Sequence, residues 1–415
     1  MKRLILLFFS LSWFTVPALA QLTLQESEEA FSRNNLLLLA EQYHIDAAKA
    51  AIIQAKIWEL PYLSGELNAV NSQNNRLFDT GKTGQKTLAI QQLIYLGGKK
   101  RNEVEFAKSN AELAELQFEQ LLLSLRYQLK QHFYSLYFNQ KKIEHIASQA
   151  SRVDTLLAAY SIQVAKANLP LKDLVRLQSL SLNLQNDLVA LQNEVISETS
   201  SLSLLTGLQP PFTPTVDSAS LEVAFRQGSR YAPEELVSQA QSANPEYLSY
   251  LRMIENQELY LSWQQSLAKP DLTAGLSYDQ RGGAFNNQVN LTLGIPLPFW
   301  NPNKGNIKLA QAQLAQAQLQ KDYRTQVLRR QINEAYQKWE KHHKQYAQFA
   351  TTTAPLDLVY DAVVENFRKG NIPMMEFTDF MESYNQSMMQ INEMRKQLII
   401  SRENLNQLVN ANVFL

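Results

Sequence analysis

The fold is decided by a stretch that the chain contains twice. Residues 34–63 read NNLLLLAEQYHIDAAKAAIIQAKIWELPYL, and residues 243–272 read ANPEYLSYLRMIENQELYLSWQQSLAKPDL. In both copies a helical pattern stops at a proline, Pro61 or Pro270, because proline lacks a backbone donor and clashes with the preceding turn. A strand pattern then follows. The spacing of roughly 200 residues exceeds the about 20 to 50 residues of solenoid units, so it indicates duplication of a whole domain-sized unit.

Two further matches support the duplication. Residues 167–170 (ANLP) correspond to residues 370–373 (GNIP), and each segment lies between two long helical patterns. Leu202–Gly207 and Leu405–Asn410 end the two halves in the same way. We therefore expect four segments, which are a signal peptide at 1–20, a first structural repeat at 21–210, an inter-repeat linker at 211–232 and a second structural repeat at 233–415.

Each repeat is expected to contain helix, strand, loop, strand, long helix, tip and long helix. The first should hold a helix over Leu24–Leu60 and strands over Tyr62–Asn71 and Thr87–Leu96, and the second should hold strands over Asp271–Asp279 and Gln288–Leu297. Tilted strands of about ten residues can cross a bilayer. Aromatic residues lie near the predicted strand ends, where membrane proteins have belts of aromatic side chains at the two membrane–water interfaces. These residues are Tyr62, Tyr95, Phe299 and Trp300.

These strands have two interpretations. Four strands cannot close a membrane barrel, since the smallest barrels have about eight, so a membrane role requires strands from several copies of the chain. Alternatively, the strands form soluble hairpins that cap a helical bundle, and association between copies is then optional.

The longest predicted helix runs from Lys99 to about Val164 without proline or glycine, a length of roughly 100 Å. Apolar and small residues alternate there at intervals of three and four, the pattern of a coiled-coil seam. The seam contains Val104, Ala107, Ala111, Ala114, Phe118, Leu121 and Leu125, and it continues through Leu177, Leu180, Leu184, Leu188, Leu191 and Val195 and through Ile307, Ala310, Leu314 and Ala317. Uncharged polar residues such as Gln311 and Gln318 populate the opposite faces, which suits a water-filled lumen and plain solvent equally.

The start of the chain and its composition indicate export. Lys2 and Arg3 precede an apolar run, Leu4–Phe14, and small residues end at Ala20, which is the order of a secretory signal peptide. The mature chain should therefore begin at Gln21. No later stretch of about 18 apolar residues predicts a transmembrane helix. The formal net charge is zero and no basic tract occurs, which argues against nucleic-acid binding.

No catalytic or cofactor-binding motif occurs, so we expect neither an enzyme nor a bound cofactor. The chain has no cysteine. Its five histidines are scattered over different predicted helices, and the adjacent pair His342 and His343 points apart, so no metal site is expected. Methionine thioethers can bind Cu(I), but we favour flexible packing for a cluster after the second tip. That cluster comprises Met374, Met375, Met381, Met388, Met389 and Met394.

Two stretches resemble the strand-to-helix junctions of a known family. Residues 91–101 read QQLIYLGGKKR, and residues 293–307 read LGIPLPFWNPNKGNI. The first is similar to the junction in the heavy-metal cation branch of the TolC-like outer-membrane efflux channel family, the branch of cobalt, zinc and cadmium resistance. The second resembles the matching junction of the second repeat in that family. The likeness extends over essentially the whole mature chain.

The resemblance implies a mainly α-helical protein with a membrane β-barrel. In the implied homotrimer, four strands per subunit complete a twelve-stranded barrel in outer-membrane lipid, and the long helices complete a periplasmic α-barrel tunnel. The implied partners are a periplasmic adaptor (membrane fusion) protein and an inner-membrane RND pump. The implied function is a passive exit duct of a tripartite efflux system, with heavy-metal cations as cargo. Two alternatives stay open: a multidrug or type I secretion duct of the same architecture, and a soluble periplasmic coiled-coil adaptor or spacer.

The resemblance also implies the functional positions. The tips are expected to dock the adaptor through Asn168, Leu169 and Pro170 in the first repeat and through Gly370, Asn371, Ile372 and Pro373 in the second. Ala167 replaces the glycine usual in the first tip, which leaves open whether the two tips share one conformation. Ile372 stands where the family often has a basic residue, so no salt-bridge lock is predicted there.

Two acidic residues follow the second tip. The resemblance implies that Glu376 and Asp379 lie at the narrow periplasmic end of the tunnel, where family members carry acidic residues. Three copies of each would form a carboxylate ring, which attracts cations and repels anions. Alternatively, they form an ordinary exposed acidic pair on a helix.

Overall fold

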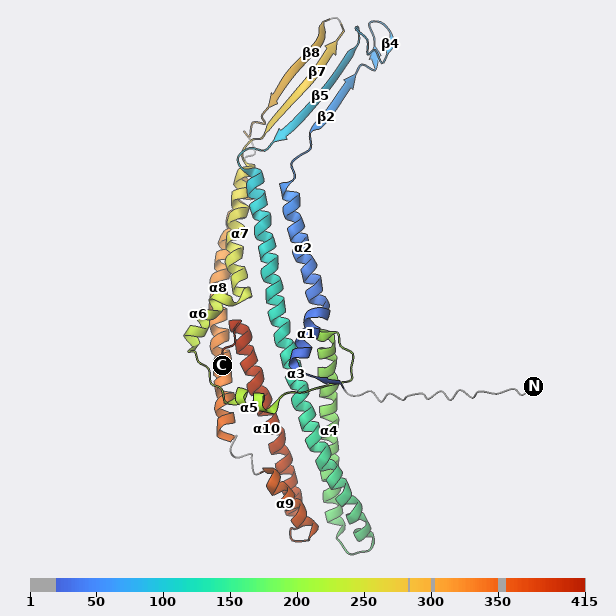
Figure 1. The fold of residues 1–415 in the computed structure, drawn as a ribbon, viewed down its shortest axis with the longest axis vertical. Coiled ribbons are helices and arrows are strands. Elements are labelled where there is room, and N and C mark those ends of the chain that lie inside the picture. The colour runs from blue at the N-terminus through green and yellow to red at the C-terminus, as the bar shows by residue number, and fades with distance from the viewer. Residues whose placement is uncertain (1–19, 283, 300–302, 350–355, 415) are drawn as a thin grey trace, which may run out of the picture.

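The computed structural model describes residues 20–282, 284–299, 303–349 and 356–414. These residues form a long, narrow molecule with a β-sheet at one end, two helical hairpins at the other end and long helices between them (Figure 1). The predicted signal peptide lies outside the described residues except for Ala20. None of the described helices is both long and apolar enough to cross a membrane.

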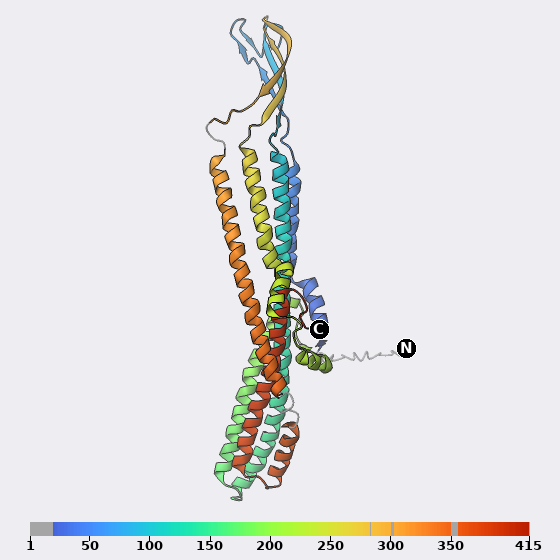
Figure 2. The same ribbon diagram turned by 90° about the vertical axis from the view of Figure 1, so that its left-hand side faces the viewer.

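Helices make up most of the chain, and the longest is α3 (Lys99–Ala165), with 67 residues, which confirms the helix predicted over 99–164. The others are α1 (Leu24–Asn34), α2 (Leu36–Lys56), α4 (Leu171–Thr206), α5 (Ser218–Arg226), α6 (Pro233–Ala243), α7 (Pro245–Leu267), α8 (Lys304–Phe349), α9 (Leu356–Arg368) and α10 (Met374–Val409). Near the sheet, α3 packs beside α2 and α7, and α8 packs beside α7. Towards the tips, α3 packs beside α4 and α10 (Figure 2).

The four predicted strands form one antiparallel sheet in the order β2-β5-β7-β8. They are β2 (Tyr62–Leu67), β5 (Gln85–Ile94), β7 (Leu272–Arg281) and β8 (Phe285–Gly294). A small hairpin, β3 (Val70–Asn71) and β4 (Arg76–Leu77), lies in the loop between β2 and β5. Within a single chain the sheet is open, with β2 and β8 at its edges.

The first predicted strand is shorter than expected. It was predicted over 62–71, but β2 ends at Leu67 because the chain turns away into a polar loop. There the amide of Asn71 donates to the buried carboxylate of Asp79 at 2.9 Å. The other three strands are confirmed, with ends shifted by one to three residues.

The two faces of the sheet differ in polarity. Apolar and polar residues alternate only in part along each strand, but the register aligns residues of the same kind in rows across the four strands. The apolar row consists of Leu63, Ile90, Leu276 and Leu291, which are between 47% and 70% exposed. The next residues, on the other face, form the row Ser64, Ala89, Ser277 and Asn290.

The aromatic residues expected at the strand ends lie at the helix side of the sheet. Tyr62 and Phe299 are exposed there, and the ring of Tyr95 lies 5.8 Å from that of Trp58. Trp300 lies outside the described residues, as do two further residues of the second junction, 301–302.

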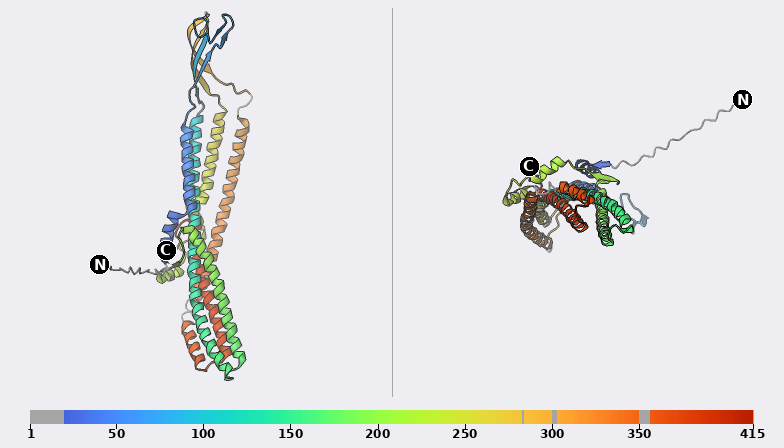
Figure 3. Two further views of the ribbon diagram at one scale, coloured as in Figure 1. Left: turned by 90° about the vertical axis from the view of Figure 1, so that its right-hand side faces the viewer. Right: turned by 90° about the horizontal axis from the view of Figure 1, so that it is seen from below.

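The predicted linker, 211–232, is ordered and packed. It contains β6 (Phe212–Pro214), which pairs in parallel with β1 (Ala20–Leu22), and it also contains α5. Phe212, Leu221 and Phe225 from this segment are buried against the long helices. Seen from below, α5 and α6 lie on one side of the helical layer (Figure 3, right). The repeat boundaries themselves stay a prediction.

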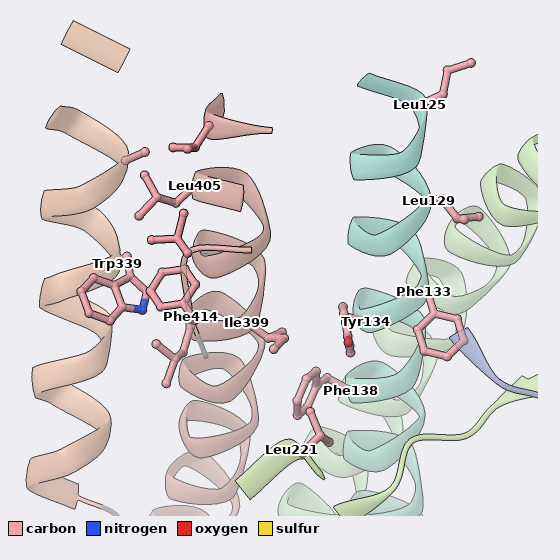
Figure 4. Close-up of a cluster of buried hydrophobic side chains, with 14 of the residues drawn as sticks. Leu125, Leu129, Phe133, Tyr134, Phe138, Leu221, Trp339, Ile399, Leu405 and Phe414 are labelled. Atoms are coloured by element: carbon pink, nitrogen blue, oxygen red, sulfur yellow. The ribbon is translucent and has the colours of Figure 1, made fainter. Parts of the chain in front are cut away.

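The helices enclose two separate hydrophobic cores. The upper core, around Phe133, Phe138, Trp339, Leu405 and Phe414, joins α3, α4, α5, α8 and α10 in the middle of the molecule (Figure 4). The lower core joins α3, α4, α9 and α10 near the tips. Its buried residues include Ile146, Leu177, Leu184, Tyr360, Phe367, Phe377 and Met381.

The single helix predicted over 24–60 is wrong, because it breaks at Asn35 and ends at Lys56. Asn35 has an extended backbone (φ −68°, ψ 113°), and its side-chain oxygen accepts hydrogen bonds of 3.1 Å from the backbone amides of Leu37 and Leu38. Its side-chain nitrogen donates to the carbonyl of Leu205, near the end of α4, at 3.0 Å. The asparagine thus caps one helix and ties it to another.

The second repeat contains the same arrangement. Asn244 separates α6 from α7 with φ −73° and ψ 117°, and its oxygen accepts from the amide of Tyr247 at 3.1 Å. Its nitrogen donates to the carbonyl of Leu408, near the end of α10, at 2.9 Å. Asn35 is 3% exposed and Asn244 is 5% exposed, so water cannot replace these bonds.

Removing either asparagine should destabilise the protein. We expect Asn35→Ala to lower the free energy of unfolding by about 2–3 kcal/mol, since it removes an N-cap and leaves a buried carbonyl without its donor. Asn35→Ser should cost about half as much, because serine restores the cap but does not reach Leu205. Urea unfolding followed by helical circular dichroism measures both, and Asn244 should behave in parallel. Equal midpoints for the alanine variant and the unaltered protein would contradict this role.

Candidate functional site

The predicted docking residues lie together at one end of the molecule, in the turns that close the two helical hairpins (Figures 1 and 3). We define the first tip as residues 166–170, between α3 and α4, and the second tip as residues 369–373, between α9 and α10. The topology therefore brings two segments about 200 residues apart in sequence to the same place, as the duplication predicts.

The first tip is a tight left-handed turn. Ala167 has φ 59°, and its amide donates to the carbonyl of Val164 at 2.9 Å. The backbone amide of Asn168 donates to the carbonyl of Gln163 at 2.9 Å, and its side-chain nitrogen donates to the side-chain oxygen of the same residue at 2.8 Å. Pro170 then has an extended backbone and starts α4. This is a helix C-cap that satisfies the last carbonyls of α3.

The second tip has the same geometry. Gly370 has φ 77°, and its amide donates to the carbonyl of Phe367 at 2.9 Å. Asn371 donates to Asn366 twice, from its backbone at 2.9 Å and from its side chain at 3.1 Å. Pro373 starts α10. The two tips therefore share one conformation, and alanine at position 167 adopts the left-handed geometry that glycine adopts at 370.

Each tip exposes its asparagine and its proline and half-buries one aliphatic side chain. Asn168, Pro170, Asn371 and Pro373 are exposed, whereas Leu169 and Ile372 are half-buried. Ile372 packs against the lower core. Exposed groups on rigid turns are suited to recognition by another protein.

Stacked aromatic rings join the two hairpins just above the tips. The ring of Phe367 in α9 lies 3.9 Å from that of Phe377 in α10 and 5.8 Å from that of Tyr160 in α3, with planes within 10° of parallel. Burial raises the pKa of the Tyr160 hydroxyl, and the nearby Asp173 carboxylate raises it further. The stack connects α3, α9 and α10 just above the tips.

The acidic pair lies on the first turns of α10, on the side away from the core. Glu376 and Asp379 are both exposed, while Phe377 and Met381, about half a turn away, are buried. Among the residues that the structure describes, no cation lies within ion-pair distance of either carboxylate. The pair is therefore available to a neighbouring copy or to solvent ions.

The corresponding turn of the first repeat carries different charges. Asp173 stands three residues after Pro170, as Glu376 stands three residues after Pro373, and both acids lie where they complement the positive end of a helix. Arg176 occupies the position equivalent to Asp379. Only the second repeat therefore combines two carboxylates.

A group of charged and aromatic side chains above the tips has no counterpart in our sequence-based expectations. Arg152 of α3 binds Asp361 of α9 at 3.0 Å, and its guanidinium lies 5.2 Å from the ring centre of Tyr360. That ring stacks on Tyr384 of α10 at 4.5 Å. No spacing in the sequence indicates this contact, because it joins helices from different repeats.

The methionine cluster belongs mostly to the packing of α10. Met374, Met381 and Met394 are buried, Met388 and Met389 are half-buried, and only Met375 is exposed. Five of the six therefore fill space between helices, which supports flexible packing over copper binding. The described part of the chain contains no group of three or more potential metal-binding side chains of histidine, aspartate or glutamate.

The shared tip conformation predicts opposite effects for two matched substitutions. Ala167→Gly should slow hydrogen exchange of the tip amides and stabilise that turn by about 1 kcal/mol, because the left-handed conformation is strained for alanine. Gly370→Ala should destabilise the second tip by about the same amount. No atom lies within 4 Å of the added methyl group at 370, so only backbone strain contributes there. Stability changes of the same sign in both variants would contradict the shared left-handed conformation of the two tips.

Comparison with known proteins gives three kinds of match. Residues 257–411 match the family described as outer membrane efflux protein. The chain is 24% identical over 311 residues to the cobalt-zinc-cadmium resistance protein CzcC of Cupriavidus metallidurans, which covers 74% of this chain and 70% of that protein.

Solved structures match nearly the whole chain. CusC, in structures that address transmembrane channel formation, superposes with a TM-score of 0.74 at 15% identity and covers 94% of this chain and 92% of its own. A membrane protein from Pseudomonas aeruginosa gives a TM-score of 0.75 at 14% identity, with 93% and 92% covered. The resemblance to the outer-membrane efflux channel family is therefore confirmed, and the chain has the fold of these channels.

Proposed function

We propose that this chain is the outer-membrane exit duct of a tripartite RND-type efflux system, a passive conduit rather than an enzyme. The observation that carries the proposal is the sheet. Its apolar row, Leu63, Ile90, Leu276 and Leu291, is exposed, whereas the row on the other face is polar or small. Such a sheet is stable when one face meets lipid and the other meets water.

Closure of the sheet requires further copies of the chain. The edge strands β2 and β8 leave backbone donors and acceptors unpaired, which is costly in lipid. Pairing of β2 in one copy with β8 in the next would satisfy them. Three copies supply twelve strands, more than the about eight of the smallest membrane barrels.

An apolar stripe on α4 supports the same association. Val175, Leu182, Val189 and Ile196 follow one another at seven-residue intervals and are between 49% and 68% exposed. The opposite face of α4 is buried on α3 through residues such as Leu184. A heptad stripe that the described part of the chain leaves exposed is suited to coiled-coil packing against a neighbouring copy.

The tips are the proposed docking site for a periplasmic adaptor that connects the duct to an inner-membrane pump. Two turns of the same geometry, held by Asn168 and Asn371, would give each subunit two equivalent binding sites for the adaptor. We propose heavy-metal cations as cargo because of the similarity to CzcC, whose name refers to resistance to cobalt, zinc and cadmium. A multidrug or secretion duct of the same architecture is the alternative cargo assignment.

The oligomeric state tests the duct directly. We expect the protein extracted from purified outer membranes in mild detergent to have the mass of three chains, by light scattering with the detergent contribution subtracted. A monomer recovered from the soluble periplasmic fraction would contradict the duct and favour a coiled-coil spacer.

The acidic pair predicts ion selectivity. We expect Glu376→Gln combined with Asp379→Asn to lower the cation-to-anion permeability ratio by about twofold or more in planar lipid bilayers, because a carboxylate ring concentrates cations. The matched control is Asp173→Asn, which removes the acid that stands three residues after the first tip's proline. Unchanged selectivity in the double variant, or an equal loss in the control, would argue against the ring.

A further inference from the structure

The loop between β2 and β5, residues 68–84, lies at the end of the sheet farthest from the helices (Figure 1), and we call it the outer loop. It exposes three apolar side chains, Val70 at 62%, Leu77 at 71% and Phe78 at 68%. Phe78 has φ 49°, a left-handed conformation that is an outlier for a bulky residue. The turn is therefore strained while it keeps an aromatic ring exposed, and such strain is typical of functional positions.

One buried carboxylate holds this turn. Asp79 follows Phe78 directly and is 5% exposed. Its carboxylate accepts hydrogen bonds from three side chains, those of Asn71 at 2.9 Å, Asn74 at 2.8 Å and Thr83 at 3.0 Å. Because the carboxylate is buried and bound from several sides, it fixes the backbone beside Phe78 and adds no exposed negative charge to the loop.

The outer loop folds against the apolar face of the sheet. Lys86 of β5 and Gln280 of β7 are partners in the register and lie on that face, because each stands four residues from a member of the apolar row. Lys86 donates to the carbonyl of Thr80 at 3.3 Å, and the side-chain amide of Gln280 donates to the carbonyl of Gly81 at 3.0 Å. Gln280 is only 6% exposed, although the apolar row on the same face is open. The loop therefore covers the far end of the face that the proposed duct turns towards lipid.

The outer loop also carries exposed positive charge. Arg76 and Lys82 are exposed, and within the described residues no carboxylate lies at ion-pair distance from either of them. The only acidic residue of the loop is the buried Asp79. Guanidinium and ammonium groups bind phosphate groups through charge-assisted hydrogen bonds. Two cations beside exposed apolar side chains match the chemistry of a lipid, which has a phosphate in its headgroup and an apolar chain below it.

We infer that the outer loop is a lipid anchor at the outer rim of the proposed barrel. Leu77 and Phe78 enter the acyl region of the outer leaflet. Arg76 and Lys82 bind the phosphate groups of its lipids. The inference rests on the proposed duct, since it requires the apolar face of the sheet to meet lipid. Such an anchor sets the depth of the barrel in the membrane, because aromatic rings and long basic side chains favour the interface.

Tryptophan fluorescence in brominated lipid tests the anchor. Phe78→Trp is reconstituted in vesicles of phosphatidylglycerol with bromine on its acyl chains, and the emission that the new tryptophan adds to that of the unaltered protein is measured. We expect about threefold or stronger quenching, because a ring at the interface contacts the bromine. The matched control is Phe285→Trp. Phe285 is 48% exposed at the same end of the sheet, but it pairs with Arg281 on the polar face, so it should be quenched little.

The outcomes separate failure of the anchor from failure of the duct. Quenching at 78 no stronger than at 285 would overturn the anchor, and a blue-shifted but unquenched emission would do so by placing the ring against a neighbouring copy. Leu291→Trp reports on the sheet itself, since this residue of the apolar row must be quenched whenever the sheet lies in lipid. Quenching at 291 without quenching at 78 contradicts the anchor alone, whereas loss of both contradicts the duct as well.

The unaltered protein decides the question if Phe78→Trp does not form the oligomer. A phospholipid with a photoreactive acyl chain should label the peptide that contains Leu77 and Phe78, as identified by mass spectrometry after digestion. Absence of this label, while peptides of the apolar row are labelled, would overturn the anchor.

A charge variant tests the phosphate contacts. In the Phe78→Trp background, brominated phosphatidylglycerol is diluted into unbrominated phosphatidylcholine, so that quenching reports enrichment of the anionic lipid at the loop. Arg76→Gln with Lys82→Gln should lower this quenching by about twofold or more, because basic side chains attract anionic lipid. The matched control is Arg329→Gln with Arg330→Gln, which removes two exposed cations from α8 and should change nothing. Unchanged quenching in the loop variant, or an equal decrease in both, would overturn the inference.

Discussion

The arrangement of the long helices depends on two buried asparagine side chains. The first amides of a helix and its last carbonyls have no partner within the helix. Asn35 provides partners for both kinds of group. Its side-chain oxygen accepts hydrogen bonds from the first amides of α2, and its side-chain nitrogen donates to the carbonyl of Leu205 near the end of α4. Asn244 does the same for α7 and for Leu408 of α10. Each side chain thus satisfies unpaired backbone groups of two helices. This fixes the end of α4 relative to the break between α1 and α2, and the end of α10 relative to the break between α6 and α7.

The two repeats share this connection but differ below the middle of the molecule. In the first repeat, a single helix, α3, runs the whole way from the sheet to the tip. In the second repeat, the same path is divided between α8 and α9. The tip turns are equivalent, so the two halves differ in the helices that lead to them. The contacts of α9 with its neighbours include the ion pair of Asp361 with Arg152 and the ring stack on Phe367.

The sequence allowed the repeat, the four strands and the long helix to be predicted, because each rests on local signals such as Pro61, Pro270 and the three-four spacing on α3. It did not allow the break at Asn35 to be predicted, since apolar residues continue on both sides and the bond to Leu205 is visible only in the fold. The shared tip conformation was also not predictable, because alanine disfavours the left-handed geometry that its neighbours impose at 167. The contact of Arg152 with Asp361 joins helices far apart in sequence, so no spacing rule could reveal it. Whether Glu376 and Asp379 form a ring depends on other copies and stays a prediction.

The sequence at the junction between the sheet and the helices is distinctive because the geometry there restricts which residues fit. Gly97 has φ 71°, and a methyl group there would lie 2.4 Å from the side chain of Lys269, so both the backbone and the space require glycine. Lys99, at the start of α3, is buried and binds Asp271 at 2.7 Å, just before β7. The same carboxylate accepts from the backbone amide of Leu96 at 3.1 Å. A buried pair of this kind adds little net stability, but loss of one partner leaves an unpaired charge at a cost of about 3–5 kcal/mol. The sheet is therefore held on the helices by contacts that link the two halves of the chain, and this geometry requires Gly97 and Lys99, which belong to the first stretch that carries the family resemblance.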